Sequence, residues 1–206
     1  MLNIAVLVSG RGTNLQAIID AVAVEGGELA GVARVVLVVS DRPKALALER
    51  ARACGIPTAV VRKKDFPERT EHDRQVMAQL AAAGAELVCL AGYMRLLSPE
   101  FIQAYEGRMI NVHPALLPAF PGLDVQRAAL EYGVKVAGCT VHFVTLEMDS
   151  GPIIVQRAVA VAEDDTPETL AARILEQEHQ AYVEAIALYA AGRLRIEGRR
   201  VRVLPG

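Results

Sequence analysis

Short apolar runs rich in β-branched residues recur along the chain, and their lengths are typical of strands buried on both faces of a sheet. Between the first four runs lie segments with the apolar spacing of helices. Because strand and helix alternate, we expect an α/β fold with a doubly wound, mostly parallel sheet. The predicted strands are residues 2–8, 34–39, 58–61, 87–91, 109–112, 137–144 and 153–161, and the predicted early helices are 15–24, 44–53 and 68–83.

The pattern changes after about residue 123. A short helix that ends at Tyr132 precedes two long strands, which we expect to form an antiparallel C-terminal extension of the sheet. A long helix then covers 167–190, with Thr166 as its N-terminal cap and Pro167 at its first position.

The tail, residues 193–204, predicts a small hairpin. No repeat, low-complexity tract or flexible linker divides the chain. Its 206 residues, of which 52% are hydrophobic, are enough to bury one substantial core. We therefore expect a single domain over 1–206.

Charge and cysteine usage narrow the setting. The net charge is −2, and basic residues are scattered among acidic ones, so nothing favours nucleic acid binding. The apolar N-terminal run is too short to span a bilayer and lacks the basic start of a secretory signal, which argues against a membrane protein. Cys54, Cys89 and Cys139 form no CxxC pair, and this pattern favours a reducing cytoplasm.

A glycine-rich turn, VSGRGTNL, follows the first predicted strand and precedes a helix. Backbone N–H groups at such a helix start can bind an anion, and glycine allows a phosphate to approach closely. The turn is neither a Walker loop nor a dinucleotide fingerprint. Two interpretations stay open, a phosphate site and a tight turn whose glycines only solve a backbone problem.

Asn111 and His113 lie two residues apart at the end of a predicted strand, so their side chains emerge on the same face. Pro114 then ends the strand, at the carboxyl edge where doubly wound folds bind ligands. A lone histidine on an apolar strand is usually a satisfied core residue. Because the adjacent asparagine would be a second costly polar group without a purpose, we favour catalysis.

Asp149 lies in the polar segment TLEMDSGP after the next long strand. A carboxylate close to an imidazole favours the imidazolium and orients the ring. The alternative is that Asp149 and Ser150 only form a turn. No serine or cysteine has the setting of a covalent nucleophile, and the histidines lack metal-ligand spacing, so we expect direct group transfer without a metal.

Five blocks, VSGRGTNLQAIID, AGYMRLLSPEF, INVHPALLPAFPG, TVHFVTLEMDSGPII and DTPETLAARILEQEHQAY, occur in this order between residue 2 and about 190. Together they resemble the glycinamide ribonucleotide formyltransferases of purine synthesis. The third block and MDSGP are shared by the wider family that uses formyltetrahydrofolate, whereas the first block indicates the acceptor. The resemblance implies the formyltransferase fold, with a phosphate-binding half at about 1–105 and a catalytic and folate-binding half at about 106–206.

The resemblance also implies roles for individual residues. Asn111, His113 and Asp149 would be catalytic. The acceptor's phosphate would be bound by Gly12, Thr13 and Asn14, and its ribose by Glu178, which would otherwise pass as a solvated helix glutamate. Residues that would contact the folate are Arg69, Met94, Arg95, Leu96, Leu97, Asn111, Thr145, Leu146, Glu147, Met148 and Asp149. Without the resemblance, Arg69 would be read as a surface charge and Met94, Leu96 and Leu97 as core.

The implied substrates are glycinamide ribonucleotide and 10-formyltetrahydrofolate, used as the formyl donor, in a monomer or homodimer. The acceptor amine would attack the formyl carbon directly and give a tetrahedral intermediate. Asn111 and protonated His113 would donate hydrogen bonds to its negative oxygen, while Asp149 would keep the imidazole cationic and help a water move the amine's proton.

Three other functions remain possible. A methionyl-tRNA formyltransferase would need a further C-terminal domain, and a formyltetrahydrofolate hydrolase a further N-terminal one, for which we expect no room. A non-catalytic nucleotide-binding module would explain the glycine-rich turn but leaves Asn111, His113 and Asp149 without a shared role.

Overall fold

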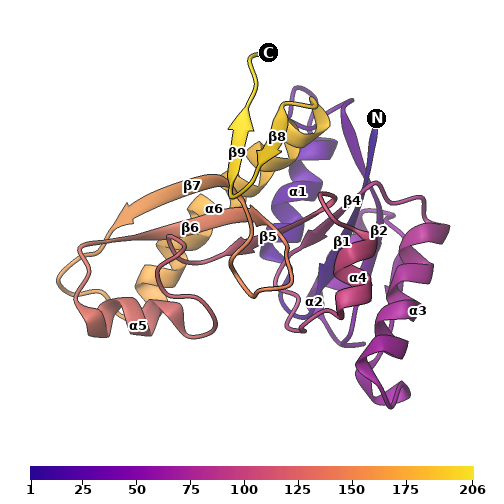
Figure 1. Ribbon diagram of the computed structural model, residues 1–206, viewed down its shortest axis with the longest axis horizontal. Helices are drawn as coiled ribbons and strands as arrows, with labels where there is room; N and C mark the ends of the chain where they lie inside the picture. The colour runs from indigo at the N-terminus through magenta and orange to yellow at the C-terminus, as the bar shows by residue number, and fades with distance from the viewer. The chain divides into compact units, whose positions relative to one another are not determined.

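In the computed structural model, which describes residues 1–206, strands and helices alternate through the first half of the chain as the hydrophobic pattern predicts (Figure 1). The chain divides into two units, Met1–Ile110 and Asn111–Gly206. Strand β5 (Met109–His113) begins in the first unit and ends in the second.

The first unit is built on parallel strands in the order β3-β2-β1-β4. Its central strand β1 is the most apolar, and Ile4–Val8 have no exposed surface. Helices connect successive strands, as parallel pairing requires. The elements are β1 (Leu2–Val8), α1 (Thr13–Ala23), β2 (Ala33–Ser40), α2 (Leu46–Ala53), β3 (Thr58–Val60), the 3-10 turn η1 (Lys63–Asp65), α3 (Arg69–Ala82), β4 (Leu87–Leu90) and α4 (Pro99–Ala104).

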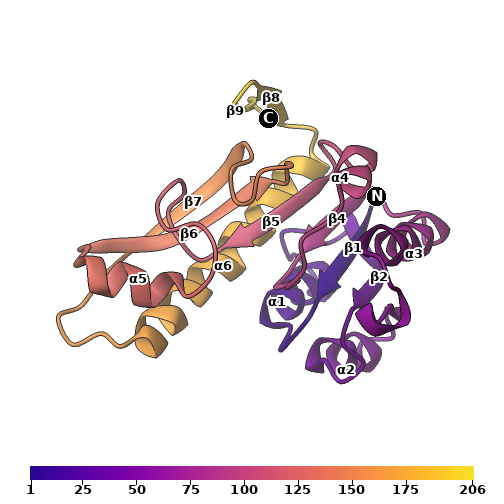
Figure 2. The ribbon, with the colours of Figure 1, turned by 60° about the horizontal axis from the view of Figure 1, so that its bottom comes forward.

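In the second unit, α6 (Pro167–Ala190) packs along the antiparallel pair of β6 (Val136–Phe143) and β7 (Ile153–Ala160), as Figure 2 shows. Helix α5 (Val125–Tyr132) also contacts α6. The predicted hairpin is present as β8 (Leu194–Glu197) and β9 (Arg200–Val203). The predicted fold class is confirmed: an α/β arrangement of nine mostly parallel strands with antiparallel strands in its C-terminal part.

Two local expectations need correction. Helix α4 was not predicted, because its six residues are too few to show a helical period; Ser98 caps it by accepting a hydrogen bond from Phe101 N. Helix α2 begins at Leu46 and not at residue 44, because Ala45 N donates to the carbonyl of Arg42 in a turn that delays the helix.

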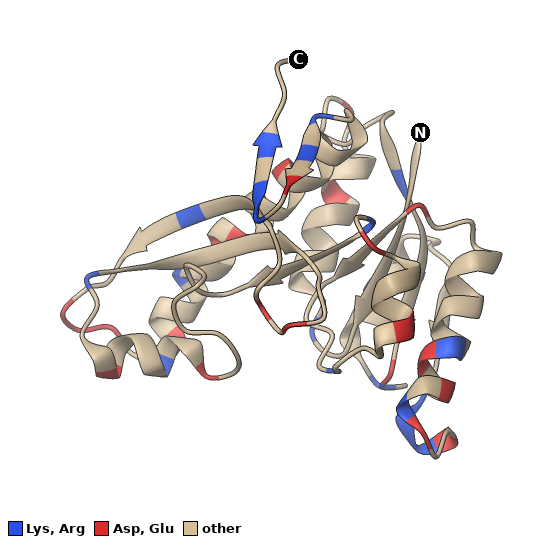
Figure 3. Ribbon diagram, in the orientation of Figure 1, with Lys and Arg blue, Asp and Glu red and all other residues tan.

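Charged residues are spread over both units (Figure 3). The basic residues gather locally on the β8–β9 hairpin, where Glu197 forms ion pairs with Arg195 and Arg202. None of the helices combines the length and hydropathy that a membrane span would need.

The start of α6 agrees with the sequence in detail. Thr166 Oγ1 accepts from Thr169 N at 3.3 Å, and Thr169 Oγ1 accepts from Thr166 N at 2.9 Å, which makes a reciprocal capping box. A hydrogen bond from Arg173 also holds the pKa of Asp165, just before the cap, well below its usual range. The start of the longest helix is therefore fixed by side chains.

We predict that Thr166→Ala lowers the free energy of unfolding by about 1 kcal/mol, the usual cost of losing a threonine cap. Urea unfolding followed by circular dichroism measures the change. Thr70→Ala is a matched control, since Thr70 is an exposed threonine in the first turn of α3. Equal effects of the two substitutions would contradict the capping role.

Candidate active site

The predicted site residues lie in both units. In the first unit, Gly12 lies directly before α1 in a left-handed conformation, with φ 73°. The first helical hydrogen bond runs from Gln16 N to Gly12 O. The amide groups of the preceding turn therefore lie at the positive end of the helix dipole, and no acidic residue stands in that turn. This geometry suits an anion.

The carbonyl groups of the glycine-rich turn are held by α2. Gly10 O accepts from Ala47 N at 3.1 Å, and Arg11 O accepts from Arg50 Nε at 2.9 Å. Arg50 also donates to Gln16 Oε1. With these carbonyls engaged, the turn is fixed in one conformation. Sequence reasoning missed Arg50, because an arginine on a helix surface is usually solvated.

Gly12 has a structural role of its own. A Cβ atom at this position would lie 2.6 Å from Ala47 Cβ, and its positive φ is strained for any other residue. The backbone conformation and the close approach of Ala47 therefore require glycine at position 12.

The other group of the first unit is segment 94–97, which lies between β4 and α4. Met94 and Leu96 are 59% and 62% exposed, so the alternative interpretation of these two residues as core is wrong, whereas Leu97 is buried. Residues 95–97 make no backbone hydrogen bond within the protein. Arg69 is exposed at the first position of α3. Exposed apolar side chains beside unpaired backbone groups form a surface suited to a flat polar ring.

In the second unit, Asn111 and His113 emerge from the same face of β5, as the spacing predicted. His113 is buried and its ring faces two acceptor oxygens. Nε2 lies 2.8 Å from the carbonyl oxygen of Phe120, and Nδ1 lies 3.5 Å from Asp149 Oδ2. Both contacts are satisfied only when the ring carries two protons.

Asp149 is brought to His113 by a folded loop. Its Oδ2 also accepts from Gly122 N at 2.9 Å, and its backbone has a φ of 52°, a conformation that Asp tolerates better than most residues. Gly151 lets the loop pass the end of β6, because a Cβ there would overlap the carbonyl oxygen of Phe143. Asp149 therefore does more than form a turn.

His142 on β6 joins this group, although no sequence motif distinguishes it. The β6–β7 register shifts between Val141 and His142, and such bulges redirect side chains. His142 Nδ1 lies 2.9 Å from the carbonyl oxygen of Phe143, and Nε2 lies 3.3 Å from Asn111 Nδ2. Nδ1 therefore donates and Nε2 accepts, which is the neutral tautomer.

The pKa of His142 agrees with that assignment. Burial lowers the pKa below its ordinary value of 6.5, and this effect exceeds the opposing influence of the Phe143 carbonyl and of Asp149. A neutral His142 orients the Asn111 amide, because its Nε2 accepts one of the two amide protons. The other proton and the amide oxygen remain for a ligand.

The loop that carries Asp149 also holds the remaining predicted folate residues. Leu146 and Met148 are 69% and 59% exposed. Ser150 Oγ donates to the carbonyl of Glu147 and lies 3.4 Å from Thr145 Oγ1, which closes the loop on itself. The loop thus presents apolar side chains on a folded backbone.

Glu178 is buried on α6, beside the apolar residues Leu170, Ile174 and Ala181 of the same helix. The interpretation as a solvated glutamate is wrong. The pKa of the Cys139 thiol on β6 is raised to about 12, mainly by burial and to a lesser extent by the charge of Glu178.

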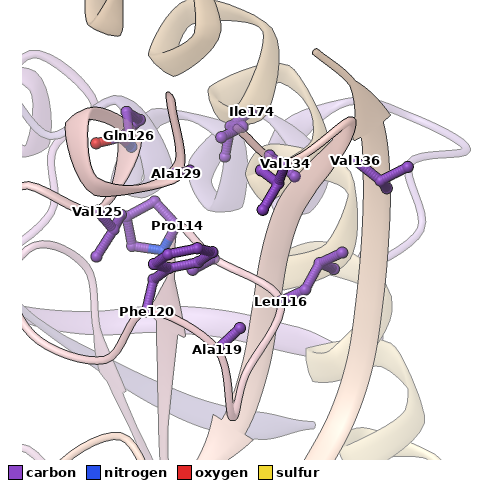
Figure 4. Close-up of a pocket in the computed structure, with 12 residues that line it drawn as sticks. Pro114, Leu116, Ala119, Phe120, Val125, Gln126, Ala129, Val134, Val136 and Ile174 are labelled. Carbon is purple, nitrogen blue, oxygen red and sulfur yellow. The ribbon is translucent and has the colours of Figure 1, made fainter. Parts of the chain in front are cut away.

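An apolar cavity of about 150 Å³ lies behind the loop that follows β5 (Figure 4). Phe120 forms part of its wall, together with residues of that loop, α5, β6 and α6. The cavity has few polar atoms and does not suit a charged substrate. No group of three or more His, Cys, Asp or Glu side chains is placed to hold a metal ion.

Comparison with known proteins identifies the family of the chain. The sequence profile described as formyl transferase matches residues 2–186. The chain therefore belongs to the formyl transferase family, and the predicted enzyme class is confirmed.

Within this family the similarity is to one branch. The phosphoribosylglycinamide formyltransferase of Escherichia coli (strain K12) is 44% identical over 195 residues, which cover 95% of this chain and 90% of the relative. The crystal structure of glycinamide ribonucleotide transformylase 1 from Symbiobacterium toebii has a TM-score of 0.96 and 55% identity, and covers 100% of this chain and 95% of its own. The chain groups with the phosphoribosylglycinamide formyltransferases, as the motifs predicted.

Longer relatives also exist. A trifunctional purine biosynthetic protein adenosine-3 from Drosophila pseudoobscura pseudoobscura is 50% identical over 193 residues. These cover 93% of this chain but only 14% of that protein.

We predict that the lowered pKa of His142 makes the fold less stable in acid. As pH falls through 6.5, the unfolded chain takes up a proton at His142 before the folded chain does, which favours unfolding. In His142→Gln this contribution is absent. The unfolding free energy of wild type relative to the variant should be constant above about pH 7.5. Below about pH 6.5 it should fall, because only wild type loses the contribution of His142. Parallel stability curves down to pH 5 would contradict it.

Proposed function

We propose that the chain transfers the formyl group of 10-formyltetrahydrofolate to the amine of glycinamide ribonucleotide, a step of de novo purine (IMP) biosynthesis. The observation that carries the proposal is the placement of Asn111 and His113 on one face of β5, with Asp149 Oδ2 3.5 Å from His113 Nδ1. The names of the relatives agree with it.

Attack of the amine on the formyl carbon produces a tetrahedral intermediate with a negatively charged oxygen. The second amide proton of Asn111 and the imidazolium of His113 are the donors for this oxygen, and each such donor is typically worth a few kcal/mol. Asp149 stabilises the imidazolium by its charge. With an ordered water it also carries the proton that the amine loses to N10 of the folate. The intermediate then collapses, the bond between the formyl carbon and N10 breaks, and tetrahydrofolate leaves.

The carbonyl oxygen of Phe120 accepts a hydrogen bond from one of these two donors, His113 Nε2. It lies 2.8 Å from His113 Nε2, within the 2.7–3.1 Å expected between a donor and an oxyanion. In the proposed reaction the substrate oxygen takes the place of the Phe120 carbonyl. Phe120 has a φ of 51°, which is unusual for a bulky side chain.

The remaining predicted roles follow from chemistry that fits each position. The turn formed by Gly12, Thr13 and Asn14 binds the phosphate of the acceptor at the start of α1. Glu178, a buried carboxylate, accepts hydrogen bonds from the ribose hydroxyls. These assignments rest on the helix terminus and on burial, respectively.

The folate is bound by segments 94–97 and 145–149 in this proposal. Met94, Leu96, Leu146 and Met148 supply exposed apolar surface for the ring system, and the unpaired backbone groups of 95–97 match its polar edge. Arg69, a cation exposed at the start of a helix, pairs with the carboxylates of the glutamate tail.

We predict that Thr13→Val raises the KM for glycinamide ribonucleotide by about tenfold or more, because it removes a hydroxyl that donates to a charged phosphate. Thr13→Ser keeps the hydroxyl and should stay within about threefold of wild type, on the same reasoning. Steady-state kinetics with the folate at saturation measure both variants. Near-equal KM values for Thr13→Val and Thr13→Ser would show that the phosphate does not bind at this turn.

We predict that Asn111→Ala lowers kcat by about a hundredfold while the affinity for a folate analogue changes much less, because the oxyanion exists only after attack begins. Asp149→Asn keeps an acceptor for Gly122 N and removes the charge, so it too should lower kcat. Asp164→Asn, in an exposed turn before α6, is the control. Single-turnover formyl transfer measures the step, and normal rates in both site variants would refute the mechanism.

A further inference from the structure

Segment 94–98 has no regular secondary structure, yet its position is fixed at both ends by buried side chains of the first unit. Met94 N donates to Ser9 Oγ at 2.9 Å, and Ser98 N donates to Asp73 Oδ2 at 2.6 Å. Between these two contacts the backbone of 95–97 makes no hydrogen bond within the protein. The segment is therefore an arch supported at two points.

The first support is built from three groups. Ser9 is 2% exposed at the end of β1, directly before the glycine-rich turn. Its hydroxyl donates to Asp41 Oδ1 at 2.6 Å, so the lone pairs of the oxygen face Met94 N. Its own amide donates to the carbonyl of Gly92. Ser9 thus holds Met94, the first residue of the arch, by its side chain, and Gly92, two residues earlier, by its backbone.

The second support is a fully buried carboxylate. Asp73 on α3 has no exposed surface, and a charge in such a place is costly unless hydrogen bonds satisfy it. Its partners are Ser98 N and, at 3.3 Å, His72 Nδ1, while His72 Nε2 lies 2.8 Å from the carbonyl of Val61. Ser98 in turn caps α4. The short bond to Ser98 N is charge-assisted and therefore one of the stronger contacts of the unit.

We propose that Ser9 and Asp73 are positioning residues for the folate, because they set the height and register of the arch that presents Met94, Leu96 and the unpaired backbone groups of 95–97. This inference rests on the proposed binding of folate by segment 94–97. Neither residue touches the reacting atoms. Their loss acts on folate binding through the backbone, and it leaves the donors on β5 in place.

A series of variants tests the proposal. Ser9→Ala removes the acceptor for Met94 N, and Asp73→Ala removes the acceptor for Ser98 N, whereas Asp73→Asn keeps an oxygen facing Ser98 N. The matched control is Ser40→Ala, because Ser40 is an equally buried serine at a strand end whose hydroxyl contacts only its own turn at Arg42. Thermal unfolding identifies any variant that fails to fold.

The first measurement is amide hydrogen exchange by NMR. Exchange at Met94 should rise about tenfold in Ser9→Ala, and exchange at Ser98 should rise similarly in Asp73→Ala and less in Asp73→Asn, which is the factor expected from loss of one hydrogen bond. Ser40→Ala should leave both amides unchanged. Unchanged exchange in the Ser9 and Asp73 variants would overturn the proposal.

The second measurement is kinetic. The KM for 10-formyltetrahydrofolate should rise about tenfold in Ser9→Ala and Asp73→Ala, with kcat within about threefold of wild type and Asp73→Asn in between. If wild type transfers formyl groups normally and the variants keep its folate KM, the positioning role is wrong. If wild-type protein shows no formyl transfer and binds no folate analogue, the proposed function itself has failed.

Discussion

The carboxylate of Asp149 is the contact on which the site of the second unit depends. It accepts a hydrogen bond from Gly122 N in the loop after β5, faces the ring of His113 on β5, and lies 3.9 Å from His142 Nε2 on β6. Its side chain is only 11% exposed, so the charge requires the donors Gly122 N and His113 Nδ1. One buried charge therefore ties two loops to two strands, and none of these segments can move without changing the surroundings of the others.

Most of the fold could be predicted from the sequence, because the spacing of apolar residues matches the positions that are buried in each strand and helix. The run 2–8 is β1, and helix 167–190 is α6 with its predicted cap. The errors lie where local contacts override pattern. Helix α4 depends on a single capping serine, and the start of α2 depends on a turn at Arg42. Such contacts involve one or two residues and leave no periodic signal.

The site was predictable where strand geometry alone decides, as for Asn111 and His113. The distance between His113 and Asp149 could not be predicted, because it depends on how the loop after β6 folds and on the bulge at the end of that strand. His142 was missed for a related reason: on a strand buried along almost its whole length, a polar residue is indistinguishable from core until the register shift is seen. The roles of Ser9 and Asp73 could not be predicted from the sequence, because each accepts a hydrogen bond from a backbone amide that is distant along the chain.

The Phe120 carbonyl makes His113 selective between kinds of oxygen. Since its Nε2 proton already has a neutral acceptor, a ground-state formyl carbonyl that arrived there would exchange one neutral acceptor for another and gain almost nothing. A negatively charged oxygen is also attracted by the charge of the imidazolium, so it forms the stronger hydrogen bond and displaces the carbonyl. Under the proposed reaction, the Phe120 carbonyl competes with the substrate carbonyl for the His113 proton, but the oxyanion displaces it. The hydrogen bond to the substrate oxygen therefore forms only as the formyl carbon becomes tetrahedral.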